Sequence, residues 1–180
     1  MFLEDALKED FRPKIQQFFQ RILAYAPYLE TFHFVIKTSN TFPHSSGIAS
    51  SASGMSALAL CLMQLESTLY NGLDADYIKR KASFLARLGS GSACRSIEGG
   101  LVVWGQHHSI QGSSDVYGCQ FPMEVHPIFK DYQDAILLVD KGKKQISSSL
   151  GHDLMHGHPF AEQRFAQANA HMQALIPILK

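Results

Sequence analysis

A stretch of small and hydroxyl-bearing residues constrains this chain more than any other feature. The segment from Thr41 to Leu58 reads TFPHSSGIASSASGMSAL. It follows residues 31–39, whose alternating apolar side chains predict a half-buried strand. After it, apolar residues recur at helical spacing, at Ala52, Met55, Leu58, Ala59, Leu62 and Leu65. The segment is therefore expected to be a loop that leads into the N-terminus of a helix.

The chemistry of this loop fits two roles. A helix N-terminus leaves backbone N–H groups unpaired and carries a partial positive charge, so it attracts phosphate, and small residues let the anion approach. Gly47, Ser50, Ser51 and Ser53 supply that combination, although the loop lacks the lysine of a P-loop. The same residues also suit capping of the helix and close packing against a neighbour. Composition alone leaves both roles open.

A second segment of the same kind, RLGSGSACRS, follows a helix expected at about residues 76–88. It contains Arg95, whose guanidinium keeps its charge and forms planar bidentate pairs with carboxylates or phosphates. An acidic substrate is one partner for this side chain, and an ordinary surface ion pair is the alternative. Cys94 beside it is either a small buried residue or a thiol with a lowered pKa. Residues 99–105, GGLVVWG, are expected to form a strand.

Charge and cysteine content exclude several classes of partner. Sixteen basic residues balance sixteen acidic ones, so no overall field recruits nucleic acid or an anionic membrane. The longest apolar run, LALCLM, is too short to span a bilayer, and the acidic N-terminal segment is unlike a signal peptide. Three widely spaced cysteines without a C-x-x-C pair indicate neither a disulfide framework nor a zinc ribbon, which favours a cytoplasmic setting.

Histidines near the C-terminus offer an alternative, a metal site. The segment HDLMHGH places His152 and His156 four residues apart, a spacing that binds zinc on a helix face. The glutamate of H-E-x-x-H is absent, and Gly157 and Pro159 are expected to end or bend a helix here. No metal-ligating residue is therefore assigned. The remaining expected elements are a helix at about residues 14–25, a buried strand at residues 135–140 and a final helix at residues 160–179.

Three segments together resemble known motifs. FPHSSGIASSASGMSALAL resembles the phosphate-binding motif of the GHMP kinase superfamily, in the form found in diphosphomevalonate decarboxylases. RLGSGSACRSIEGGLVVW is similar to that subfamily's own signature, and ISSSLGH is a weaker third match. The resemblance covers residues 32–179 and implies an α+β GHMP kinase fold. It places an N-terminal nucleotide- and substrate-binding domain at residues 1–128 and the beginning of a C-terminal domain at residues 129–180.

The resemblance also implies an activity. Members of the subfamily use ATP and Mg²⁺ to phosphorylate the tertiary hydroxyl of mevalonate 5-diphosphate, then release phosphate and carbon dioxide to give isopentenyl diphosphate. The residues implied around the ATP phosphates are Ser45, Ser46, Gly47, Ser50, Ser51 and Ser53. Those implied around the substrate phosphates are Ser90, Gly91, Ser92 and Ser148. Arg95 is the implied catalytic residue, paired with the substrate carboxylate.

Two parts of the family's site have no counterpart in the sequence: an early strand with an Asn and a Lys, and a late glycine-containing loop with the Asp proposed as base. We therefore expect the 180 residues to be the central part of a longer enzyme and inactive by themselves. Related mevalonate 3-kinases and phosphomevalonate decarboxylases are the first alternative, and a shortened, non-catalytic nucleotide-binding protein is the second. Family members are commonly homodimers, although no apolar stripe in this sequence demands such an interface.

Overall fold

The computed structural model describes residues 2–3, 6–7, 9–42, 49–137, 151 and 154–180. Helices carry most of this structure and two small sheets accompany them, so the chain is α+β, as predicted. In order, the elements are β1 (Phe2–Leu3), β2 (Ala6–Leu7), η1 (Glu9–Phe11), α1 (Arg12–Ile22), η2 (Pro27–Thr31), β3 (Lys37–Thr38), α2 (Ser50–Leu69), α3 (Ala75–Gly89), η3 (Gly91–Ser96), β4 (Val102–Trp104), β5 (Gly118–Gln120), η4 (Pro127–Phe129) and α5 (Ala161–Leu179).

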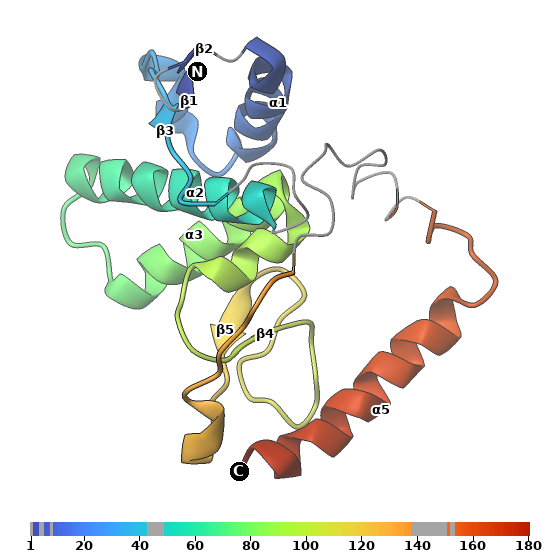
Figure 1. Ribbon diagram of the computed structural model, residues 1–180. Coiled ribbons are helices and arrows are strands. Elements are labelled where there is room, and N and C mark those ends of the chain that lie inside the picture. Colours follow the sequence, from blue (N-terminus) through green and yellow to red (C-terminus); the bar gives the residue numbers. More distant parts are fainter. Residues whose placement is uncertain (1, 4–5, 8, 43–48, 138–150, 152–153) are drawn as a thin grey trace.

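The elements are stacked in layers (Figure 1). The helix α1 and a three-stranded sheet, in the order β2-β1-β3, lie on one side of α2, and α3 lies on the other side. In the sheet, β1 pairs antiparallel with β2 and parallel with β3. Beyond α3 lies the antiparallel pair of β4 and β5, in which Val103 faces Cys119. The turn η3 contacts α2, α3 and both strands of this second sheet.

The larger hydrophobic core lies between α1, α2 and α3. Its buried side chains are Phe18, Ile22, Ala26, Tyr28, Leu29, Ala52, Met55, Ala59, Leu62, Met63, Ala82, Leu85, Ala86 and Ala93. Alanines are frequent where α2 meets α3, and their small side chains let the two helices approach closely. Each large apolar side chain buried in this way contributes about 1.5–3 kcal/mol. The core therefore fixes the position of α2 relative to α3.

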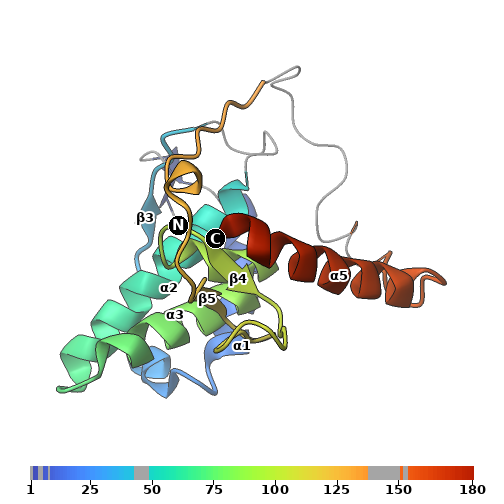
Figure 2. The same cartoon turned by 90° about the horizontal axis from the view of Figure 1, so that it is seen from below.

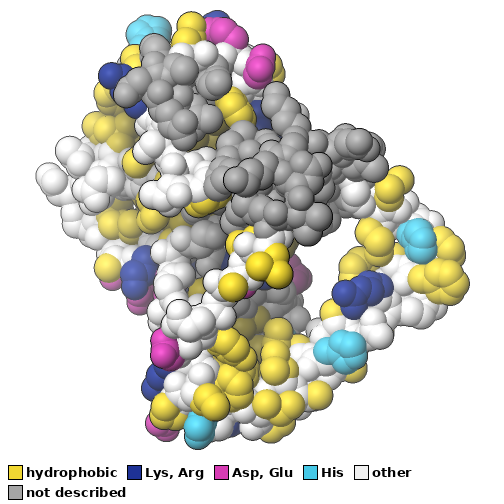
Figure 3. Space-filling view, viewed as in Figure 1, with side chains coloured by type: hydrophobic (Ala, Val, Ile, Leu, Met, Phe, Trp, Pro, Cys, Tyr) yellow, Lys and Arg dark blue, Asp and Glu magenta, His cyan; other side chains and the backbone are white. Residues whose placement is uncertain are grey.

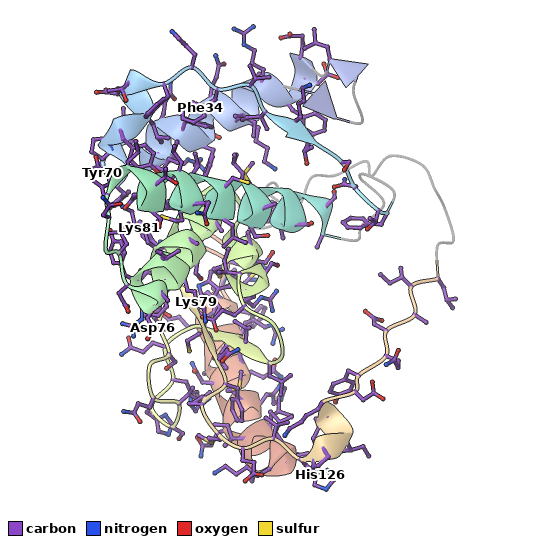
Figure 4. The ribbon with its side chains drawn as sticks, turned by 90° about the vertical axis from the view of Figure 1, so that its left-hand side faces the viewer. Phe34, Tyr70, Asp76, Lys79, Lys81 and His126 are labelled. Atoms are coloured by element: carbon purple, nitrogen blue, oxygen red, sulfur yellow. The ribbon has the colours of Figure 1, made fainter. Side chains whose placement is uncertain are left out.

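A buried ion pair joins the same two helices. Lys81 Nζ on α3 lies 2.6 Å from Glu66 Oε1 on α2, and the two side chains are only 16% and 5% exposed. The hydroxyl of Tyr77 donates to Glu66 Oε1 at 3.4 Å and accepts from Lys81 at 3.2 Å. Figure 4 shows Lys81 at the boundary between the helices, beneath the end of α2 that carries Tyr70. The pair anchors α3 to α2 at the end opposite to the start of α2.

The helix α5 contacts the layered part of the chain through its last two turns. There Ile176 and Leu179 complete a second, smaller core with Val103, Ile110 and Phe121, and the N–H of His126 donates to the carbonyl of Leu179 at 2.8 Å. The rest of α5 extends away from the layers (Figure 2), and apolar side chains remain visible along it in the space-filling view (Figure 3). The predicted final helix is confirmed, whereas most of its apolar stripe is exposed.

The predicted strands differ most from the structure. The expected alternation holds from Phe34 to Ile36, with Phe34 and Ile36 partly buried and Val35 exposed, but Phe32, expected on the same face as Phe34, is exposed. Within residues 31–39 only β3 pairs with another strand. The strand predicted at residues 135–140 is wrong for residues 135–137, which form no ladder and leave Leu137 88% exposed. An apolar run becomes a strand only beside a partner, and no described strand lies next to this one; residues 138–140 lie outside the described part.

The helices agree better with expectation. The helix predicted at residues 14–25 begins two residues earlier, at Arg12, because Pro13 suits the first turn of a helix, and it ends at Ile22. The helix predicted at residues 76–88 is α3, and the helix after the serine-rich loop is α2. None of the helices among the described residues has the length and apolar character needed to cross a membrane.

Candidate functional site

The serine-rich segment forms the first turn of α2. Ala49 precedes the helix in the left-handed conformation, with φ 52° and ψ 32°, which costs a residue with a β-carbon about 1–2 kcal/mol. From this position its carbonyl accepts hydrogen bonds from the N–H groups of Ala52 at 2.9 Å and Ser53 at 3.2 Å. The side chains of Ser51 and Ser53 are exposed, and their hydroxyls form no hydrogen bond with another described residue. They are therefore available to a ligand.

The residues suited to the two roles left open for this segment, helix packing and phosphate binding, lie on opposite faces of α2. Ala52 and Met55 are buried in the larger core, so close packing is correct for that face. Ser51 and Ser53 lie on the exposed face, where phosphate binding stays a prediction. The small residues thus allow packing on one side without blocking the other.

The start of α3 shows what α2 lacks. The carboxylate of Asp74 caps α3 by accepting the N–H groups of Asp76 and Tyr77, each at 3.1 Å, and Asp76 adds a second negative charge to the first turn. The first turn of α2 contains no acidic residue, and Ala49 has no side-chain oxygen to cap it. The positive end of α2 is therefore not neutralised by its own first turn, a condition that favours binding of an external anion.

The second small-residue segment forms η3, a tight turn after α3. The N–H of Ser90 donates to Ala86 at 3.0 Å, and its carbonyl accepts from Ala93 at 2.8 Å, so one residue ends α3 and begins η3. Ser92 is partly buried and Arg95 is exposed. Within the described part of the chain, Arg95 forms no ion pair, so the alternative of a surface ion pair finds no partner there.

Helix packing brings the two segments together. A β-carbon at Gly89 would lie 2.6 Å from Met55 Sδ on α2 and 3.0 Å from the Phe18 ring on α1. Glycine at this position lets the end of α3 approach both helices, and η3 follows immediately. Ala93 of η3 then enters the same core as Ala52 of α2. The structure therefore places Ser90, Gly91 and Ser92 on a turn that packs against α2.

Three residues that the sequence analysis did not single out support η3. The hydroxyl of Ser83 donates to the carbonyl of Cys94 at 2.8 Å and accepts from the N–H of Gly118 at 2.9 Å. Trp104 packs against Gly91, where a β-carbon would lie 3.2 Å from the indole ring. One signal was present in the sequence: Ser83 is a polar residue on the face of α3 that also carries Ala82 and Leu85.

Cys94 is a buried structural residue. Burial raises the pKa of its thiol, and this effect outweighs the opposing positive charges of Arg95 and Arg87. The alternative of a lowered pKa is therefore wrong for Cys94. None of the three cysteines, Cys61, Cys94 and Cys119, forms a disulfide.

Several predicted site residues lie outside the described residues: Ser45, Ser46, Gly47 and Ser148. His152 of the metal alternative lies outside them as well. In the part of the chain that the structure describes, no three His, Cys, Asp or Glu side chains form a group that could hold a metal ion. The described candidate site therefore consists of the exposed start of α2 and of η3 with Arg95.

Several known proteins similar to this chain are named diphosphomevalonate decarboxylase. A family model described as "Diphosphomevalonate decarboxylase-like N-terminal domain" matches residues 1–116, which include both segments. The diphosphomevalonate decarboxylase of Eremothecium gossypii is 36% identical over 125 residues, 69% of this chain and 29% of that protein. Those of Ganoderma lucidum and Bos taurus are 36% identical over 128 and 116 residues, which are 71% and 64% of this chain and 30% and 26% of theirs. The chain spans less than a third of the length of these curated relatives.

Proposed function

Because the chain belongs to the diphosphomevalonate decarboxylase-like family, we propose that the protein containing it converts mevalonate 5-diphosphate to isopentenyl diphosphate in an ATP-dependent decarboxylation. One observation carries the proposal: a helix start whose first turn contains no acidic residue and an arginine-bearing turn, both built from small residues, belong to elements that pack together. A substrate that carries phosphates and a carboxylate requires both kinds of group. The proposed fold is that of the GHMP kinases, with domains at residues 1–128 and 129–180.

The start of α2 is the proposed site for the ATP phosphates. Ser50, Ser51 and Ser53 lie in its first turn, and Ser45, Ser46 and Gly47 precede it in sequence. The absence of a carboxylate from this turn supports the assignment, because a carboxylate there would repel phosphate. When bound, ATP and Mg²⁺ supply the phosphoryl group and neutralise its charge. The residues of this chain bind and orient the phosphates.

The turn η3 is the proposed site for the substrate. Ser90, Gly91 and Ser92, together with Ser148, are proposed to contact its diphosphate. The guanidinium of Arg95 is exposed and is proposed to hold the carboxylate with two parallel hydrogen bonds. Decarboxylation breaks the bond between the carboxylate carbon and its neighbour, and the electron pair of that bond forms the new double bond as phosphate leaves. A fixed carboxylate keeps the breaking bond aligned with the leaving group.

Setting and assembly are part of the same proposal. A cytoplasmic enzyme is supported by three cysteines that are all free, since thiols persist in a reducing compartment. A homodimer is proposed from the family alone.

The reaction itself provides the first test. The protein containing this chain is incubated with ATP, Mg²⁺ and mevalonate 5-diphosphate, and ADP and carbon dioxide are measured together. We expect equal amounts of both. Formation of ADP without carbon dioxide would refute the decarboxylase and favour a mevalonate 3-kinase, whereas no turnover would favour a non-catalytic nucleotide-binding protein.

The role of Arg95 has its own test. The substitution Arg95→Lys keeps the charge and removes the planar fork, so we expect kcat/KM to fall about 100-fold, or ~2.7 kcal/mol. Arg80→Lys is the matched control, because Arg80 is an exposed arginine in the first half of α3, and its activity should stay within about twofold of wild type. Equal activity of the two variants would contradict the assignment.

A further inference from the structure

A single buried hydroxyl connects three elements around the arginine-bearing turn. Ser83 lies on the buried face of α3 and is 2% exposed. A serine hydroxyl has one hydrogen to donate and lone pairs to accept. It donates to the carbonyl of Cys94 on η3 at 2.8 Å and accepts from the N–H of Gly118 on β5 at 2.9 Å. The hydroxyl hydrogen of Ser83 is thus bonded to η3, and a lone pair of its oxygen is bonded to β5.

The carbonyl that Ser83 binds belongs to the peptide bond between Cys94 and Arg95. A peptide unit is planar, so fixing its oxygen also fixes the direction in which the backbone of Arg95 begins. Gly118 closes the other side, since a β-carbon there would lie 2.8 Å from the same oxygen. This peptide is therefore held from α3 and from β5 at once.

The side chain of Arg95 has no comparable support. It is exposed and makes no ion pair or hydrogen bond with other residues in the described ranges. The direction of its Cα–Cβ bond therefore depends on the backbone at Arg95. A bidentate pair with a carboxylate is sensitive to that direction, because both N–H groups must meet both oxygens.

We propose that Ser83 is a positioning residue, whose hydroxyl fixes the peptide before Arg95 so that the guanidinium meets the carboxylate of mevalonate 5-diphosphate. The inference rests on the proposed function and adds to it a residue that contacts no ligand. The competing view is that Ser83 only satisfies buried backbone groups. Under that view, its loss weakens the fold without any specific dependence on Arg95.

A double-mutant cycle separates the two views. Binding of mevalonate 5-diphosphate is measured by titration calorimetry for the wild-type protein, Ser83→Ala, Arg95→Ala and the double variant. We expect Ser83→Ala alone to weaken binding roughly tenfold, because a displaced guanidinium loses its second hydrogen bond. In the Arg95→Ala background, the same change should weaken binding less than about twofold, since no guanidinium is left to misplace.

The chain offers a matched control for loss of a buried hydroxyl. Ser56 on α2 is also buried, but among the described residues its hydroxyl bonds only to carbonyls of its own helix, those of Ala52 and Ser53, each at 2.9 Å. Ser56→Ala should leave the affinity unchanged. If Ser83→Ala does not fold, Ser83→Cys takes its place in the cycle, because a thiol has the same shape with a somewhat larger atom and is a poor hydrogen-bond donor.

The outcomes distinguish this inference from the proposed function. An equal loss of affinity from the Ser83 variant in both backgrounds would overturn the positioning role and leave the function of Arg95 intact. No loss from Ser83→Ala would do the same. No binding by the wild-type protein, or no effect of Arg95→Ala, would overturn the proposed function and this inference with it.

Discussion

The ion pair of Lys81 and Glu66 gives the most direct test of how α3 is held against α2. Replacing Lys81 by methionine keeps an unbranched apolar side chain and removes the ammonium group. The carboxylate of Glu66, which is 5% exposed, now lies 2.6 Å from the Lys81 ammonium. In the variant it would remain buried without this cation. Only neutral hydroxyls would then remain near it in the described part of the chain, that of Tyr77 at 3.4 Å and that of Tyr28, whose pKa is raised by burial and by the Glu66 charge.

The expected loss follows from that burial. Removing one member of a buried ion pair destabilises a protein by about 3–5 kcal/mol, because the other charge is left unpaired. Lys81 itself retains 16% exposure, so water can partly reach the carboxylate and the lower end applies, about 3 kcal/mol. With a urea dependence of about 2 kcal/mol per molar, the unfolding midpoint of Lys81→Met should fall by about 1.5 M.

Urea unfolding of the full chain, followed by far-ultraviolet circular dichroism, measures this shift. The exposed pair of Arg12 and Glu9, at 3.5 Å and with side chains 66% and 59% exposed, is the control, and Arg12→Met should cost less than about 0.5 kcal/mol. Combining Glu66→Gln with Lys81→Met removes both charges and should restore most of the lost stability. A Lys81→Met midpoint equal to that of Arg12→Met would refute the reasoning.

Two further predictions concern close packing and titration. Gly118→Ala forces a β-carbon to 2.8 Å from the Cys94 oxygen and should lower the free energy of unfolding, measured by thermal unfolding, by about 1–3 kcal/mol. Gly54→Ala, in a helix and with nothing within 4 Å, should raise it by up to about 1 kcal/mol. The opposite order of the two variants would contradict this reasoning. Burial, and then the charge of Glu66, raises the pKa of Tyr28 above 10.0, so the unfolding free energy should fall as pH rises past that value. In Tyr28→Phe the unfolding free energy should fall less steeply with pH, by up to the slope that one titrating proton produces. An unchanged slope would contradict the raised pKa of Tyr28.

The helices were predictable because their signals are local. The spacing of apolar residues indicated α2, and Asp74 is a typical N-cap at the start of α3. The strands were less predictable, because alternation indicates which side chains are buried but not which backbone will pair. The side chain of Phe34 is partly buried as expected, although its backbone pairs with no other strand. Leu137 shows that an apolar run without a partner strand remains unpaired.

The candidate site divides in the same way. Small residues and Arg95 could be recognised from the sequence, because each motif is contiguous. The contact of Gly89 with Met55 and the bonds of Ser83 depend on residues distant in sequence, so no local pattern predicts them. They determine how the two motifs meet, and only the fold provides that information.

The hydroxyl of Ser83 also has a consequence for the order of folding. The larger core uses buried residues no later than Ala93, so it can form before the second sheet has emerged from the ribosome. The carbonyl of Cys94, however, gains its second neighbour only when Gly118 arrives, 118 − 94 = 24 residues later. At about 5–20 residues per second on the ribosome, that delay is roughly 1–5 seconds. During synthesis the body of the protein can therefore be compact while the turn that carries Arg95 is still free to rearrange.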